Sequence, residues 1–333
     1  MKVFLTSAFP EREATYIPHL EHLASKDRFR IHTLTDDPET ADLILFLDAN
    51  MHPGDIGLNA IRRHPVAMRH RDKTYLYNEQ DQPWCAMPGL YVSMPRKAFN
   101  ATRQRSCAYV SLPNPQVLEV WRETVAPDLL FSFLGRRGPA LRQAILALSH
   151  PRALVEDTSG VNFFYFPNEE TERRKQRYAE VAARSKFVLC PRGDGVSSFR
   201  LFETMAAARV PVIISDQWVP PAGPDWNRCS ITIGERDVTR IPAILEEREP
   251  EFETMAAAAR REWLEWFAPE VLFHRMTEQC LDIHRSRLGR PGWNMLDGRY
   301  LWLRAREAKW QAKRWIARAV RRVAMADGKA VAA

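Results

Sequence analysis

The sequence predicts an α/β protein with a parallel, doubly wound sheet, and three observations support this fold class. Short apolar segments alternate with segments of helical periodicity along most of the chain. The run Leu43–Leu47 is continuously apolar, which is typical of a strand buried on both faces, as in parallel sheets. A strand, a loop, a helix and a second strand follow one another over residues 187–215, with the lengths of a βαβ unit.

The individual elements follow from the same patterns. Helices are expected where apolar residues recur every three or four positions, as Ile17, Leu20 and Leu23 do. The expected strands are Lys2–Thr6, Phe29–Leu34, Leu43–Leu47, Lys73–Tyr77, Leu129–Leu134, Phe187–Cys190 and Pro211–Ser215. The expected helices are Tyr16–Ser25, residues 55–64, Ala140–Leu148, Thr171–Ala183, Phe199–Ala208 and most of Pro250–Arg287. Residues 82–115 are rich in proline and are expected to be mainly loops.

Length and composition limit the class of protein. The chain has 333 residues, of which 45% are hydrophobic, so it is long enough for about two domains and too apolar for general disorder. No apolar run approaches the roughly 18–20 residues of a membrane span, and the first residues lack the apolar core of a signal peptide. The five cysteines form no C-x-x-C pair, so the thiols are expected to stay reduced in the cytoplasm.

Positive charge is concentrated at the C-terminus. The chain carries a net charge of +7, yet the residues from Arg299 onward hold ten basic and two acidic side chains. The rest is therefore nearly neutral, and no nucleic-acid partner is expected. Residues 299–323 form a basic amphipathic pattern that includes Trp302, Trp310 and Trp315, and this pattern suits an anionic membrane surface. A solvated or packed terminal helix is the alternative.

The stretch Ser185–Glu203 has the pattern of an anion-binding turn. A buried strand leads into a loop that contains Gly193 and Gly195, where the backbone can approach a ligand closely. Ser197 or Ser198 is the natural N-cap of the following helix. Free backbone N–H groups and the helix dipole then favour a phosphate at this point.

Charged side chains complete this pattern. Arg192 and Arg200 flank the loop and are placed to contact a diphosphate, and Glu203 is placed to accept hydrogen bonds from ribose hydroxyls. Each feature also has an ordinary structural interpretation, such as a turn glycine, a capping serine or an i, i+3 ion pair between Arg200 and Glu203. Taken together at the carboxyl end of a parallel strand, they favour a nucleotide diphosphate site.

Two other functions fit parts of the same pattern. Gly193 and Gly195 after a strand, with Asp216 at the end of the next strand, outline a nicotinamide dinucleotide fingerprint and hence an NAD-dependent oxidoreductase. Ser198 replaces the third glycine of that fingerprint, which weighs against it. The other alternative is a non-catalytic binding protein that keeps the fold.

The segment Ser185–Trp218 resembles the C-terminal signature of the exostosin family, glycosyltransferase family 47. Three further segments are similar to the same family, and the likeness covers about residues 30–250. These segments are Asp37–Leu43, Phe131–Gly135 followed by Arg142, and 225–242.

This resemblance implies a GT-B-like fold, in which two Rossmann-like domains face a cleft. Residues 1–126 would form the acceptor-side domain, 127–290 the nucleotide-sugar-binding domain and 291–333 the basic tail. It also implies an inverting glycosyltransferase that uses a nucleotide sugar, usually a UDP sugar. The acceptor would be a glycan or a lipid-linked molecule, as in the synthesis of a polysaccharide. The enzyme would be cytoplasmic, with peripheral attachment to the inner face of the membrane as the alternative.

The resemblance also implies a set of donor-binding residues. They are Gly135, Arg136, Arg142, Arg192, Gly193, Gly195, Ser197, Ser198, Arg200, Glu203 and Asp216. Of these, Glu203 would hold the ribose, and Asp216 would either contact the donor or cap a turn.

The chemistry needs one general base and a way to stabilise the leaving diphosphate. No two aspartates lie two residues apart, so no metal and no cofactor are expected, and arginines would carry the charge of the diphosphate. Asp48, Glu79 and Asp81 follow strands in the N-terminal half and are the candidate bases, of which only one is expected to act.

Overall fold

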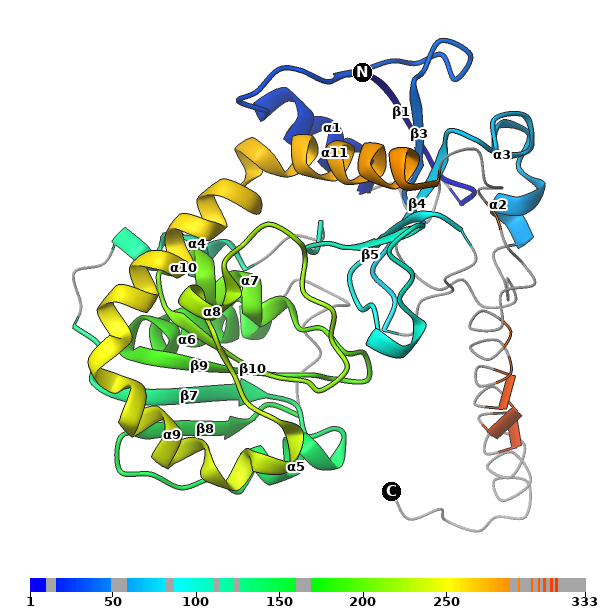
Figure 1. The fold of residues 1–333 in the computed structure, drawn as a ribbon. Coiled ribbons are helices and arrows are strands. Elements are labelled where there is room, and N and C mark those ends of the chain that lie inside the picture. Colours follow the sequence, from blue (N-terminus) through cyan, green and yellow to red (C-terminus); the bar gives the residue numbers. More distant parts are fainter. Residues whose placement is uncertain are drawn as a thin grey trace.

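The structure is a computed structural model that describes residues 1–9, 16–48, 59–81, 87–110, 114–122, 126–159 and 169–287, with Trp293 and scattered positions from 301 to 316. Two parallel sheets, each flanked by helices, stand side by side (Figure 1). The predicted α/β class with two parallel, helix-flanked sheets is confirmed.

The N-terminal sheet has six parallel strands in the order β2-β1-β3-β4-β5-β6. Their bounds are β1 (Lys2–Thr6), β2 (Thr33–Leu34), β3 (Leu43–Phe46), β4 (Thr74–Asn78), β5 (Gly89–Tyr91) and β6 (Gln104–Ser106). The flanking elements are α1 (Tyr16–Lys26), α2 (Asn59–Arg63), α3 (Pro65–Arg69) and η1 (Arg96–Ala98). The next two elements, α4 (Pro115–Glu119) and η2 (Val120–Arg122), pack instead against helices of the second unit. Because side chains alternate along a strand, Leu43 and Leu45 join the core under α1, whereas Ile44 and Phe46 join the core under α2 and α3.

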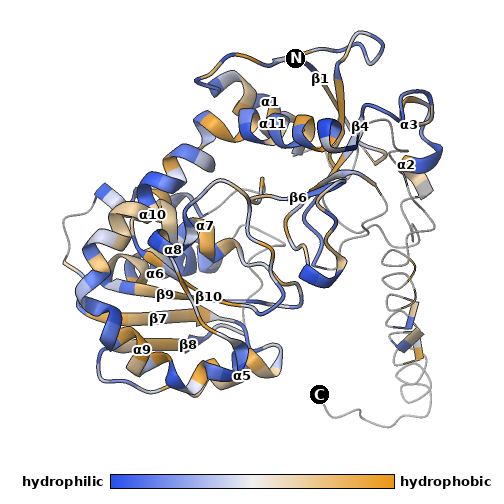
Figure 2. Cartoon of the chain, viewed as in Figure 1, coloured by the Kyte–Doolittle hydropathy of each residue, from blue (hydrophilic) through white to orange (hydrophobic). Residues whose placement is uncertain are grey.

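The second sheet has five parallel strands in the order β11-β10-β9-β7-β8. Its strands are β7 (Leu129–Gly135), β8 (Ala153–Asp157), β9 (Ser185–Pro191), β10 (Val210–Ile214) and β11 (Ile231–Thr232). Its other elements are α5 (Ala140–Leu146), α6 (Glu169–Arg184), α7 (Phe199–Ala206), α8 (Trp226–Cys229), η3 (Glu235–Arg240), α9 (Ile241–Arg248), η4 (Glu249–Glu251) and α10 (Phe252–Trp266). Phe131, Phe133 and Phe187 fill the core under α5, α9 and α10. Figure 2 shows these central strands as apolar and much of the helix surface around them as hydrophilic.

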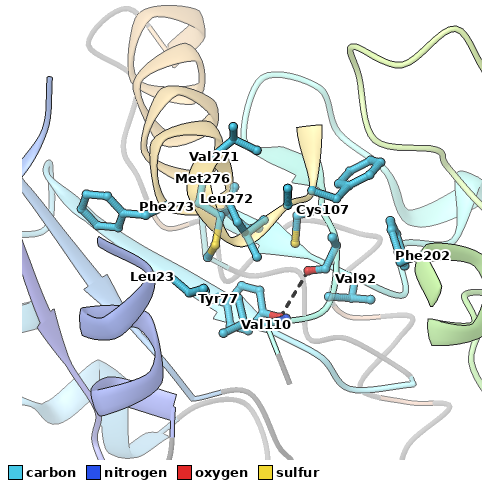
Figure 3. Close-up of a cluster of buried hydrophobic side chains, with 14 of the residues drawn as sticks. Leu23, Tyr77, Val92, Cys107, Val110, Phe202, Val271, Leu272, Phe273 and Met276 are labelled. Atoms are coloured by element: carbon cyan, nitrogen blue, oxygen red, sulfur yellow. Dashed lines mark hydrogen bonds between the residues drawn. The ribbon is translucent and has the colours of Figure 1, made fainter. Parts of the chain in front are cut away.

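The last long helix, α11 (Pro269–Arg287), returns the chain to the first sheet. It follows α10 directly in the chain and packs along α1 and against β5 and β6 (Figure 1). One continuous hydrophobic cluster follows from this crossing, because it contains Phe273 and Met276 of α11, Tyr77 of the first sheet and Phe202 of α7 (Figure 3). The predicted domain boundaries after residues 126 and 290 stay predictions, and α11 is the part of the second predicted domain that lies against the first sheet.

Several elements differ from the sequence-based expectation. Strand β8 falls in a stretch without a predicted element, and β5 and β6 lie within the proline-rich segment expected to be loops. Only Thr33–Leu34 of the expected strand 29–34 pairs with a neighbour, because this strand is the edge of its sheet. The predicted basic helix 299–323 lies almost wholly outside the described residues. Among the helices described, none is both long enough and apolar enough to cross a bilayer.

Candidate active site

A glycine-containing loop, residues 192–198, lies between β9 and α7 at the carboxyl end of the second sheet, and we call it the glycine loop. Ser198 occupies the N-cap position of α7 with extended backbone angles, as the sequence predicted. Its hydroxyl does not cap the helix and, among the residues described, has no hydrogen-bond partner although it is buried. The start of α7 therefore keeps unused polar capacity that faces this loop.

The glycine loop touches the first sheet. The backbone N–H of Val196 donates to Ser93 Oγ at 2.8 Å, and Ser93 Oγ donates to the backbone oxygen of Asp81 at 3.2 Å. A Cβ on Gly195 would lie 2.4 Å from Ser93 Oγ and 2.5 Å from Asp81 Oδ1. Gly195 is thus required by the close approach of the two sheets. Ser93 belongs to no recognisable sequence motif. Its contact with the glycine loop follows from the fold, which brings the two segments together.

Guanidinium groups gather beside this contact. Arg142 Nε donates to the backbone oxygen of Arg192 at 3.0 Å, and a Cβ on Gly193 would lie 3.0 Å from Arg142 Nη2. Burial and the positive charge of Arg200 lower the pKa of Arg142 to about 10, with a smaller contribution from Arg136. The carboxylates of Asp194 and Asp81 oppose this shift. Partly buried, neighbouring guanidinium groups of this kind can be stabilised by an anion.

The Arg200 side chain is positioned by the second sheet. Its Nε donates to the backbone oxygen of Leu134 at 3.1 Å, and its guanidinium lies 5.6 Å from the ring centre of Phe133 and 5.2 Å from that of Phe199. Gly135 ends β7 next to Leu134, where a Cβ would lie 2.3 Å from Phe133 Cζ. The ends of β7 and β9 therefore place Arg200, Arg142 and the glycine loop together.

Arg192 is placed differently from Arg142 and Arg200. Its guanidinium makes two hydrogen bonds to the Glu235 carboxylate, at 2.7 and 2.9 Å, and this pairing raises the pKa of Arg192. The Glu235 backbone N–H donates to Asp216 Oδ1 at 3.0 Å, so Asp216 braces the same turn. A diphosphate contact by Arg192 would require this ion pair to open, and both the Arg192 and Asp216 assignments remain predictions.

Glu203 is buried in the protein, whereas a side chain that binds a ribose must be reachable by that ligand. Only 3% of the residue is exposed, and its Oε1 accepts a hydrogen bond from the Asn114 backbone N–H at 2.9 Å. Burial raises the pKa of Glu203 to about 7, while the Asn114 N–H, Arg200 and Tyr178 oppose that rise. The carboxyl therefore ties α7 to the segment that links the two sheets, and the ribose role stays a prediction.

The three candidate bases occupy different surroundings. Asp48 is 2% exposed and accepts hydrogen bonds from Ser7 Oγ at 3.0 Å and the Ala8 backbone N–H at 3.2 Å. Glu79 accepts from the Val110 backbone N–H at 2.8 Å and from the hydroxyl of Tyr77. These contacts fasten β3 and β4 to neighbouring segments of their own domain.

Asp81 alone among the three lies against the glycine loop. The residue is exposed, yet its carboxyl group faces Gly195 and the surrounding protein removes enough water to raise its pKa. The negative charge of Asp194 raises it further, and the Gly195 N–H and Arg142 act against the rise. A carboxylate of raised pKa opposite a cluster of guanidiniums can accept a proton at one point while an anion is held at another.

The packing at Gly195 gives a first prediction. We expect Gly195→Ala to lower the free energy of unfolding by about 1–3 kcal/mol, because the added Cβ displaces Ser93 and Asp81 from the loop. Thermal or urea unfolding measures this loss. Gly138→Ala is the matched control, since the nearest atom to its Cβ would be Arg142 Cδ at 3.7 Å. Equal stability of the two variants would contradict the close contact.

The raised pKa of Glu203 gives a second prediction. The folded protein binds this proton more tightly than the unfolded chain, whose pKa is 4.5, so stability from this group is present below pH 4.5 and is lost as pH rises to about 7. Glu203→Gln keeps an acceptor for Asn114 and removes the titration. We expect parent stability to fall relative to the variant between these pH values by up to about 3 kcal/mol. Urea unfolding at several pH values tests this, and parallel profiles would contradict it.

Comparison with known proteins gives matches that include the segments of this site. The profile of the Exostosin GT47 domain family matches residues 62–248, more than half of the chain. The Exostosin-1 homolog of Caenorhabditis elegans is 44% identical over 80 residues, which are 23% of this chain and 20% of that protein. Exostosin-1 of Bos taurus is 35% identical over 79 residues, 23% of this chain and 11% of that protein. The chain therefore matches a fifth or less of the length of these relatives.

Among solved structures, a glycosyltransferase from Rickettsia africae is similar at 10% identity and a TM-score of 0.37, over 87% of this chain and 99% of that one. The extent of the family match and the motif Ser185–Trp218 within it lead to one conclusion. The chain belongs to the exostosin GT47 family of glycosyltransferases.

Proposed function

We propose that this protein is an inverting, metal-independent glycosyltransferase that moves a sugar from a UDP sugar to a hydroxyl of a glycan or lipid-linked acceptor. One observation carries the proposal. The partly dehydrated guanidinium of Arg142 lies with Arg200 at the glycine loop, and the Asp81 carboxyl of the other sheet lies across from them. An anion site and a base are thus supplied by different domains.

The guanidinium cluster would stabilise the leaving group. As the bond between the sugar C1 and the diphosphate oxygen breaks, negative charge develops on that oxygen. Arg142 and Arg200, together with backbone N–H groups at the start of α7, would then interact with this developing negative charge. Such interactions favour the transition state over the ground state because the charge on the bridging oxygen is largest there.

Asp81 would act as the general base. It accepts the proton of the acceptor hydroxyl while that oxygen attacks C1 from the face opposite the diphosphate, so the anomeric configuration inverts. Within the described part of the chain, the Asp81 carboxylate contacts the glycine loop, whereas Asp48 and Glu79 accept hydrogen bonds from segments of their own sheet. Its raised pKa makes it a stronger base than an ordinary aspartate.

The uridine nucleotide, the acceptor class and the absence of a metal are supported by sequence. Family membership favours a UDP sugar, and no Asp-x-Asp pair is present to bridge a cation to the diphosphate. The basic pattern of residues 299–323 supports contact with an anionic membrane surface, and hence a peripheral location on the cytoplasmic face.

Donor binding gives a third prediction. UDP is expected to bind with unchanged affinity when EDTA is present, and Arg200→Ala is expected to weaken it by roughly 10- to 100-fold, the loss of one charged hydrogen bond. Calorimetric titration with UDP measures both. Arg184→Ala is the control, because this arginine pairs with Asp128 on the exposed surface. Tighter binding of NAD than of UDP would instead favour the oxidoreductase.

The base gives a fourth prediction. Asp81→Asn should keep UDP affinity and lower kcat by about 10²- to 10⁴-fold, because the amide cannot accept the proton. Parent activity should decline as pH falls through the raised pKa of Asp81. Release of UDP from a panel of UDP sugars with a cell-derived glycan extract measures both effects.

Asp194→Asn is the matched control, because this second carboxylate lies in the glycine loop opposite Asp81 and has no assigned proton transfer. Full activity of Asp81→Asn would exclude Asp81 as the base. Loss in Asp194→Asn alone would transfer that role to Asp194.

A further inference from the structure

A group of side chains of the kinds that bind metal ions lies away from the glycine loop, at the edge of the first sheet. His32 immediately precedes β2, and His274 and Glu278 lie one turn apart on α11. Residues four apart share one face of a helix, so both α11 side chains point toward the same neighbour. The group therefore joins two segments separated by more than 200 residues in the sequence.

The distances suit a shared ion. One ligand atom from each of these three residues lies within 4.8 Å of the other two, and His32 Nε2 is 3.0 Å from Glu278 Oε1. A tetrahedral ion with bonds of about 2.0–2.1 Å needs ligand atoms roughly 3.3 Å apart. The His32 and His274 rings stack with centres 5.0 Å apart and planes inclined by 25°, so one ring must also turn for both lone pairs to face the same ion. The Glu278 side chain is 39% exposed, which leaves it room to move toward that ion.

Both imidazoles are buried with unused nitrogen atoms. His32 is 6% exposed and His274 is 7% exposed. Within the described part of the chain, Nδ1 of each ring is buried and has no hydrogen-bond partner. Buried polar atoms without partners are rare in folded proteins and call for an occupant.

Some neighbouring groups favour a cation at this position and others disfavour it. Asp27 and Glu278 place negative charge near the two rings, and Phe29 stacks on His274 with ring centres 4.1 Å apart. Arg275 and the N-terminal ammonium group oppose a cation. The Arg275 guanidinium, however, lies 3.9 Å from the ring centre of Trp266, and its Nε donates to the backbone oxygen of Glu265 at 3.1 Å. Its charge is thus held by these contacts.

We propose that His32, His274 and Glu278 bind one Zn²⁺ ion, which fastens α11 to the edge of the N-terminal sheet. Two imidazoles and one carboxylate are ligands that zinc accepts, and the exposed side of Glu278 leaves room for a water molecule at the fourth position. The site is separate from the proposed sugar transfer, so it does not depend on that function.

Direct metal binding tests the proposal. Metal-free protein is expected to bind one Zn²⁺ per chain in calorimetry and to melt at a higher temperature with Zn²⁺ than with EDTA. Co²⁺ in place of Zn²⁺ should give the visible absorption of a four-coordinate ion without the band of a bound thiolate, which excludes the buried cysteines as ligands. UDP titration in EDTA should be unaffected, so failure here and failure of the transferase proposal are distinguishable.

Two variants locate the ion. Glu278→Gln is expected to weaken Zn²⁺ binding roughly tenfold or more, because one charged ligand is lost. Glu246→Gln is the matched control, since Glu246 Oε1 also lies 3.0 Å from a histidine nitrogen, His150 Nε2, and no third ligand accompanies that pair among the residues described. Unchanged Zn²⁺ affinity in Glu278→Gln, an equal loss in Glu246→Gln, or no stoichiometric Co²⁺ absorption in the parent would overturn the proposal.

Discussion

The contact between the glycine loop and the end of the first sheet is the constraint on which the site depends. Gly195 leaves no room for a Cβ against Ser93 and Asp81, so the glycine loop packs directly on the first sheet at this point. That point places groups of opposite sign within one small region, with guanidiniums on one side and a carboxylate on the other. The candidate base Asp81 follows a strand of the first sheet, whereas Arg142 and Arg200 belong to the second, so the proposed chemistry requires both sheets.

The crossing of α11 supports this arrangement from the opposite side of the molecule. Its buried face, with Phe273 and Met276, shares one hydrophobic cluster with Tyr77 of the first sheet and Phe202 of α7. The relative position of the sheets is therefore set by packed side chains as well as by the glycine loop. Packed cores resist gradual deformation, so the two domains are expected to keep a defined separation.

Much of the fold followed from the sequence, because apolar periodicity reports burial directly. The central strands β3 and β9 were predicted from continuous apolar runs, whereas β8 was missed because its residues Ala153–Asp157 are partly exposed and carry two acids. The glycine loop was predicted as an anion site from its spacing. Its contact with Ser93 was not predictable, since that residue lies in a loop-like, proline-rich stretch with no motif.

The partners of the charged site residues could not be predicted from the sequence either. Glu235 engages Arg192 across 43 residues of sequence, and no local pattern indicates such a pair. The same holds for Glu203, whose hydrogen bond to Asn114 depends on the path of the linker between the sheets. Sequence spacing identified residues whose side chains could bind a diphosphate or accept a proton. Tertiary packing determines which of these side chains face one another.

The late position of α11 in the chain also bears on how the protein is made. One face of the N-terminal sheet is covered by residues 269–287, so the first 126 residues leave the ribosome with apolar side chains such as Tyr75 and Leu90 still uncovered. This first sheet cannot complete its core during translation until the final long helix has emerged. The nascent chain consequently requires protection from aggregation over most of its synthesis.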